Sequence, residues 1–111
     1  MGLKVFKFGG SSVADASAIS HVCQIIAQNP KKLAVVVSAM GGVTDSLLGL
    51  AERAMSGKRQ DEDSIISSLN KQHLEASKIL ISSEELRASY AKSVGEKLEE
   101  LKKMLDGVGV L

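Results

Sequence analysis

Cysteine and aromatic residues are scarce in this chain of 111 residues, which has one Cys, no Trp, one Tyr and two Phe. A single cysteine excludes an internal disulfide. Because aromatic rings are few, the chain offers few surfaces on which the bases of single-stranded nucleic acid could stack. A net charge of +1 also gives no electrostatic reason to expect a nucleic-acid partner. No apolar run approaches the ~20 residues of a membrane span, and no signal-peptide pattern begins the chain. We therefore expect a cytoplasmic protein without nucleic-acid or membrane partners.

Two short apolar runs, residues 3–8 and 33–38, are rich in β-branched or aromatic side chains and predict β-strands. The second run is apolar almost throughout, which is typical of a parallel strand covered on both faces. Between the runs, spacing of i, i+3, i+4 and i+7 predicts an amphipathic helix from about Ala14 to Gln28. Its stripe consists of Ile19, Val22, Cys23 and Ile26. Strand, helix and strand would form a right-handed βαβ unit.

The rest of the chain is predicted to be helical. Thr44 is expected to cap a helix with Asp45 in its first turn and Gly57 at its end. The apolar face of this helix consists of Leu47, Leu50, Ala51 and Ala54.

Two further helices are expected to form an antiparallel hairpin. Acidic residues 61–63 open the first, and Ser82 with Glu85 makes a capping-box pattern for the second, which Gly107 is expected to end. The apolar stripes are Ile66, Leu69, His73, Ala76 and Leu80 in the first, and Leu86, Tyr90, Val94, Leu98, Leu101 and Leu105 in the second.

The most informative local motif is the glycine turn, residues 7–13, where the first strand passes into a helix. Adjacent glycines let backbone approach an anion closely, free N–H groups at a helix start attract negative charge, and Lys7 adds a full positive charge. Phosphate is the natural ligand of such a turn. An ordinary tight strand-to-helix turn with a surface lysine is the alternative on these residues alone.

Residues 7–15, KFGGSSVAD, resemble the N-terminal signature of the aspartate kinases, within the amino-acid kinase family. Residues 36–45, VVSAMGGVTD, resemble their second motif, in the same order. The resemblance is strong over residues 3–48. It implies an α/β fold, the N-terminal βαβ portion of a three-layer α/β/α amino-acid kinase domain followed by a helical hairpin, and mostly helical here. Residues 1–58 would be the phosphate-binding portion and 59–111 the hairpin of the catalytic domain.

The reaction implied by the resemblance is ATP plus L-aspartate giving ADP and 4-phospho-L-aspartate, with Mg²⁺ on the nucleotide. This reaction is the first step of lysine, threonine and methionine biosynthesis. Lys7 would be catalytic, and Ser38 and Thr44 would lie near the acceptor aspartate. The implied ATP-binding residues are Lys7, Phe8, Gly9, Gly10, Ser11 and Ser38. We expect a homo-oligomer, and we expect no resident metal site.

Family members carry later in the chain a glutamate in a Gly-Glu motif, an arginine for aspartate, nucleotide loops and regulatory ACT domains. None of these occurs in the 111 residues. We therefore expect an N-terminal fragment that is inactive by itself, from a monofunctional enzyme or from one fused to homoserine dehydrogenase. The alternative is a self-contained helical protein-interaction module whose glycine turn is structural.

Several residues have ordinary structural interpretations as well. Ser38 could end a strand, and Gly41-Gly42 could be a flexible connection. Asp45 is expected to complement the helix dipole and not to act as a base.

The histidines, the cysteine and the acidic run are not expected to form a site. His73 is expected to be hydrogen-bonded and partly buried, and His21 to face solvent. Cys23 is expected in the core. The acidic run at 61–63 is expected to be a solvated helix start and not a cation site.

Overall fold

The computed structural model describes residues 2–29 and 31–110. The chain forms two compact units, unit 1 (residues 1–44) and unit 2 (residues 45–111). A pair of strands and a larger share of helical residues in the described chain confirm the predicted α/β class. In chain order the elements are β1 (Lys4–Phe8), a 3₁₀ helix η1 (Gly10–Val13), α1 (Ala16–Ala27), β2 (Leu33–Val37), α2 (Val43–Ser56), α3 (Glu62–Leu80) and α4 (Glu84–Val110).

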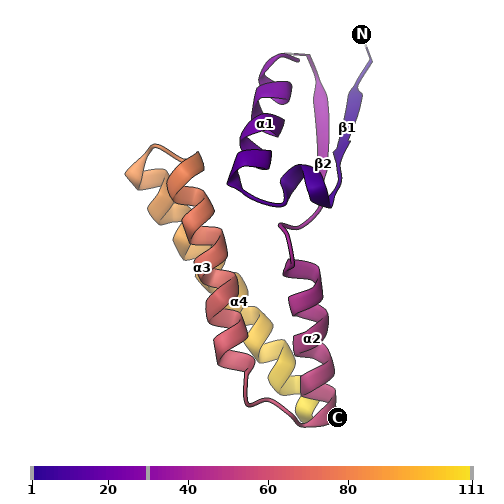
Figure 1. Ribbon diagram of the computed structural model, residues 1–111, viewed down its shortest axis with the longest axis vertical. Coiled ribbons are helices and arrows are strands. Elements are labelled where there is room, and N and C mark those ends of the chain that lie inside the picture. Colours follow the sequence, from indigo (N-terminus) through magenta and orange to yellow (C-terminus); the bar gives the residue numbers. More distant parts are fainter. Residues whose placement is uncertain (1, 30, 111) are drawn as a thin grey trace. The chain divides into compact units, whose positions relative to one another are not determined.

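Unit 1 is the predicted βαβ unit. β1 and β2 pair in parallel, with Lys7 opposite Val36 and Phe8 opposite Val37, and α1 connects them and packs beside the pair (Figure 1). The Asp15 carboxylate accepts a hydrogen bond from the Ala18 N–H at 2.9 Å and caps α1. The helix therefore begins two residues later than predicted, because the glycine turn first forms η1.

Cys23 is exposed, so its expected place in the core is wrong. Of the predicted stripe, Val22 is the residue that is fully buried. A sheet of two strands is narrower than the apolar stripe of α1, which leaves the flank of the stripe in solvent. For the same reason Val36 and Val37 remain exposed, and β2 is not covered on both faces within the described ranges.

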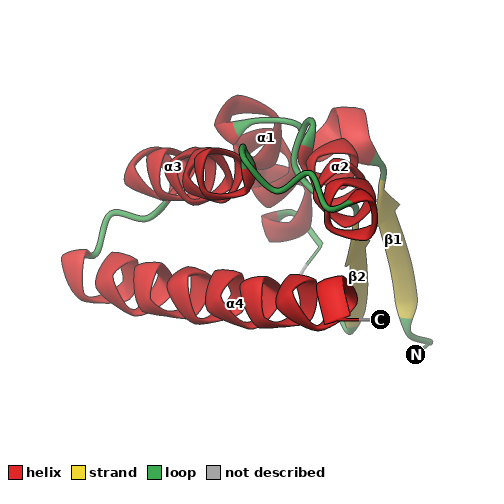
Figure 2. Ribbon diagram, turned by 90° about the horizontal axis from the view of Figure 1, so that it is seen from below, coloured by secondary structure: helices red, strands yellow, loops and turns green. Residues whose placement is uncertain are grey.

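Unit 2 contains the predicted helical hairpin. α3 and α4 lie side by side (Figure 1, Figure 2), and Lys102 near the end of α4 pairs with Asp63 at the start of α3 at 3.0 Å, as the antiparallel arrangement requires. Leu69 and Leu105 are buried, as the predicted stripes require. In α2 the predicted face is buried at Leu50 and Ala54, and the helix ends before Gly57, whose φ is +70°.

Three predicted helix boundaries are wrong. α2 already begins at Val43, so Thr44 lies inside its first turn and is not the cap. α4 is capped by Ser83, whose hydroxyl accepts from the Leu86 N–H at 3.2 Å, and not by a Ser82 capping box. α4 also continues past Gly107. One glycine costs a helix only about 1 kcal/mol relative to alanine, which is too little to end it.

Two members of the predicted apolar stripes are also misplaced. Leu86 in α4 is 62% exposed and Leu47 in α2 is 39% exposed. The guanidinium of Arg87 donates to the carbonyl oxygens of Ile81 and Ser82 and so fastens the turn between α3 and α4. That polar contact closes the turn without Leu86.

Among the described helices, none has the length and apolar character needed to cross a membrane.

Candidate functional site

The two sequence motifs meet at the carboxyl edge of the parallel strand pair. Lys7 and Phe8 end β1, and Ser38 directly follows β2. The Ser38 N–H donates to the Phe8 carbonyl oxygen at 3.1 Å, which extends the strand pairing by one step. The carboxyl ends of parallel strands lie at the same edge of the sheet, and ligands of open α/β sheets bind outside that edge. The structure thus brings Ser38 beside the start of the glycine turn.

The glycine turn is open and short. Gly9 precedes η1 with φ −74° and ψ −178°, and its carbonyl oxygen accepts from the Ser12 N–H at 3.1 Å. The first N–H groups of a helical segment have no acceptor within that segment, so those of Gly10 and Ser11 are available to a ligand. Gly9, Gly10 and Ser11 are all exposed. A Cβ built at Gly9 or Gly10 would meet no other described atom within 4 Å.

The second motif loop is fastened to the first. The Gly41 N–H donates to the Ala14 carbonyl oxygen at 2.9 Å, and a Cβ at Gly41 would lie 3.2 Å from that oxygen. The next residue, Gly42, has φ +78°, a conformation that favours glycine. A flexible connection was the ordinary alternative for this glycine pair, and the sequence did not predict the close approach. No local signal could have indicated it, because Gly41 and Ala14 lie 27 positions apart in the sequence.

Side chains at this edge carry one positive charge in an exposed position. Lys7 is exposed and has no ion-pair partner within the described part of the chain. Phe8 is half-buried and contacts Phe6 edge to face, with ring centroids 6.2 Å apart, which anchors the end of β1. Thr44 is exposed in the first turn of α2, and in the described ranges no hydrogen bond joins it to Lys7 or Ser38. Asp45 lies in that turn as expected.

A sequence model of the amino acid kinase family matches residues 2–106. The chain belongs to the amino acid kinase family. Its resemblance to aspartokinases is confirmed by the relatives that it matches. It is 54% identical over 56 residues to an aspartokinase of Thermus thermophilus, covering 48% of this chain and 14% of the relative. An aspartokinase of Mycobacterium bovis is 52% identical over 56 residues, covering 48% of this chain and 13% of the relative.

A plant relative matches nearly the whole chain. Aspartokinase 1, chloroplastic, of Arabidopsis thaliana is 35% identical over 113 residues, covering 96% of this chain and 18% of the relative. The matched segments thus cover less than a fifth of the length of each of these relatives. The match over residues 2–106 includes the helical hairpin of unit 2, so the hairpin is part of the amino acid kinase sequence pattern.

The two histidines lie in the environments that the sequence predicted. His73 is half-buried and its Nδ1 lies 2.7 Å from the Leu69 carbonyl oxygen, which confirms the prediction. His21 is exposed, as predicted. No cluster of three or more His, Cys, Asp or Glu side chains that could hold a metal ion occurs among the described residues.

The acidic run at the start of α3 differs from the predicted solvated helix start in one residue. Glu62 is only 6% exposed, and Arg59 donates to its two oxygens at 2.8 and 2.7 Å. Arg59 also donates to Asp106 of α4. These hydrogen bonds, first that to Glu62 and then that to Asp106, raise the pKa of the Arg59 guanidinium above its ordinary value. The buried Glu62 carboxylate is thus paired with Arg59, and Arg59 connects the start of α3 to the last turns of α4.

Proposed function

We propose that this chain provides the phosphate-binding turn and part of the acceptor site of an aspartate kinase. The reaction would transfer the γ-phosphoryl group of ATP, bound with Mg²⁺, to L-aspartate and release ADP and 4-phospho-L-aspartate. This step would open lysine, threonine and methionine biosynthesis in the cytoplasm, in a homo-oligomeric enzyme. Membership of the amino acid kinase family and the similarity to aspartokinases support the proposal.

The observation that carries the proposal is that the fold gives no reason for glycine at positions 9 and 10. Neither residue has a positive φ, and a Cβ at either position would meet no other described atom within 4 Å. A structural glycine turn, which the interaction-module alternative requires, would need one of these constraints. A bare backbone is instead useful where an external group must approach closely, as a phosphate does in a backbone cradle.

The geometry supports distinct roles at this edge. Phosphoryl transfer depends mainly on positioning and on neutralising charge at the transferring group. Lys7 would place its ammonium against that group, and the N–H groups of Gly10 and Ser11 would donate to phosphate oxygens. Phe8 and Gly9 would contribute backbone at the same point, where the turn leaves β1.

The acceptor would lie beside the second motif loop. Ser38 is held next to Phe8 by the 3.1 Å backbone hydrogen bond, and its hydroxyl would orient the carboxylate that attacks the bound phosphate. Thr44, one loop later, would bind the aspartate from the first turn of α2. A side-chain carboxylate is already ionised near neutral pH, so its attack on ATP needs no strong base.

We further propose that residues 1–58 form the phosphate-binding portion of the catalytic domain and residues 59–111 its helical hairpin. The arginine for aspartate and the nucleotide loops of the family pattern do not occur in these 111 residues. The chain by itself should therefore show no ATP-dependent phosphorylation of aspartate, and measurable turnover would refute this part of the proposal.

The mechanism is tested in the full-length protein encoded by the gene that carries this segment. Lys7→Met should lower kcat by roughly 10²-fold or more, because a preorganised charge at the transferring group is worth about 3 kcal/mol. Lys4→Met is the matched control, since Lys4 is an exposed lysine at the opposite end of the same strand. Normal turnover in Lys7→Met, or equal losses in both variants, would remove Lys7 from the mechanism.

A further inference from the structure

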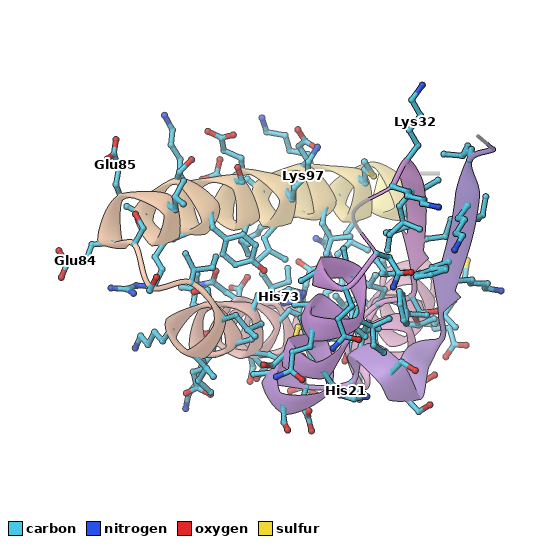
Figure 3. All side chains as sticks on the ribbon, turned by 90° about the horizontal axis from the view of Figure 1, so that it is seen from above. His21, Lys32, His73, Glu84, Glu85 and Lys97 are labelled. Carbon is cyan, nitrogen blue, oxygen red and sulfur yellow. The ribbon has the colours of Figure 1, made fainter. Side chains whose placement is uncertain are left out.

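An open cavity of about 330 Å³ lies along the seam between α3 and α4, inside unit 2. This volume falls within the range of roughly 300–1,000 Å³ that is usual for small-molecule sites. Figure 3 labels His73 on α3 and Lys97 on the neighbouring α4, one on each side of the seam. The seam cavity is lined by His73, Tyr90, Ser93, Val94, Lys97 and Leu98. The five residues from α4 follow the spacing i, i+3, i+4, i+7 and i+8, so they form one continuous face.

The body of the seam cavity is apolar. Val94, Leu98 and the ring of Tyr90 are each half-buried, so each still exposes apolar surface that a ligand could cover. Covering such surface is favourable by about 25 cal/mol per Å². Burial also raises the pKa of the Tyr90 phenol, which keeps the hydroxyl neutral and able to donate a hydrogen bond.

The polar groups of the seam cavity come from side chains, because N–H groups in the interior of a helix are already bonded within it. Lys97 carries a positive charge on a flexible stem that can follow the apolar surface. Its ammonium lies 3.5 Å from a Glu100 carboxylate oxygen, an exposed pair whose attraction is weak enough to yield to a ligand. Ser93 adds a second hydroxyl group to that of Tyr90.

His73 completes the polar set from the opposite helix. Its Nδ1 lies 2.7 Å from the Leu69 carbonyl oxygen, which can only accept, so Nδ1 carries the hydrogen. In the neutral ring Nε2 then has a lone pair and no hydrogen, so it cannot donate to a carboxylate, and the groups of the seam cavity that can bind an anion all come from α4.

We propose that the seam cavity binds a small monocarboxylate with a compact apolar body, whose carboxylate pairs with Lys97 and accepts from the hydroxyls of Tyr90 and Ser93. The positive charge of Lys97 among the lining residues favours an anionic ligand. No carboxylate lines the seam cavity, so nothing there favours a cationic ligand. A single full positive charge, without arginine or a free helix N-terminus, is poorly suited to a polyphosphate. The apolar residues supply the contact surface for the body of the ligand.

The test is a titration of the ¹⁵N-labelled 111-residue chain with 4-phenylbutyrate, followed by NMR. We expect saturable shifts that centre on residues 90–98 and His73. Lys97→Gln should weaken binding roughly three- to fivefold, the usual size of an exposed ion-pair contribution. Lys103→Gln is the matched control, since Lys103 is an exposed lysine on α4 outside the lining, and it should bind as the unaltered chain does. Both substitutions lie on an exposed helix surface and leave the buried residues intact.

The neutral analogue 4-phenylbutan-1-ol separates charge recognition from simple apolar partition. It should bind more weakly to the unaltered chain by about the same factor, and Lys97→Gln should leave its affinity unchanged. Equal affinities for the acid and the alcohol would overturn the proposal, as would shifts outside the lining or an absence of saturation. Shifts at the lining that follow protein concentration without any ligand would also overturn it, because a second copy of the chain would then occupy the seam.

Discussion

Gly41→Ala tests whether the two motif loops are held together by a close backbone contact. The Gly41 N–H donates to the Ala14 carbonyl oxygen at 2.9 Å, and the added Cβ would lie 3.2 Å from the same oxygen. That distance is tighter than ordinary van der Waals contact, so the oxygen must move by a few tenths of an ångström. It cannot do so without straining the hydrogen bond that it accepts.

The expected cost follows from these two effects. Inserting a methyl group into a packed position costs about 1–3 kcal/mol, and a typical hydrogen bond contributes about 0.5–1.5 kcal/mol net. Because the required movement is small, we expect Gly41→Ala to lower the free energy of unfolding of unit 1 by about 1 to 2 kcal/mol. Urea denaturation followed by circular dichroism measures the loss, and amide exchange at residue 41 reports the hydrogen bond directly.

Gly10→Ala is the matched control, because a Cβ there would meet no described atom within 4 Å and its φ is not positive. Replacing glycine where alanine fits stabilises by about 0.4–1 kcal/mol through the unfolded chain, so this variant should be neutral or slightly more stable. Equal losses of stability in both variants would refute a close contact at Gly41, as would amide exchange at residue 41 that is as fast in the unaltered chain as in Gly41→Ala.

Three further predictions concern single side chains. Tyr90 is the only tyrosine in the sequence, and its absorbance should titrate above pH 10 in the folded chain, because burial raises its pKa. The contribution of the neutral phenol to stability is complete below pH 10 and is lost as the pH rises through the higher folded pKa. A folded-state pKa of 10 or below would contradict the burial of Tyr90. Ser83→Ala should lower the free energy of unfolding by about 1 kcal/mol in a urea titration, whereas Ser82→Ala should change it little, and the reverse order would restore the capping box at Ser82. In the full-length protein, Thr44→Val should raise KM for aspartate far more than KM for ATP, and an unchanged KM for aspartate would leave Thr44 without a role in acceptor binding.

Local patterns in the sequence were sufficient to predict the elements, and they are the basis of the proposed class of site. Alternating and 3.6-residue periodicities depend only on near neighbours, so the strands, the parallel βαβ unit and the hairpin could all be predicted. The motif around Lys7 indicated a phosphate turn for the same reason, since strand, glycines and helix start are consecutive in the chain. Helix boundaries were less predictable, because Ser82 and Ser83 have equal intrinsic capping ability and the contact made by Arg87 favours the second.

Tertiary structure decided what depends on which surfaces meet. Cys23 belongs to the apolar stripe of α1 by its spacing, yet the sheet of unit 1 is too narrow to cover it. Glu62 looked like a solvated acid, but pairing with Arg59 lets it be buried. The contact between Gly41 and Ala14 joins residues 27 positions apart, so no local pattern could specify it. Sequence determines elements through interactions between near neighbours, whereas burial and loop contacts depend on partners that only the folded chain brings within reach.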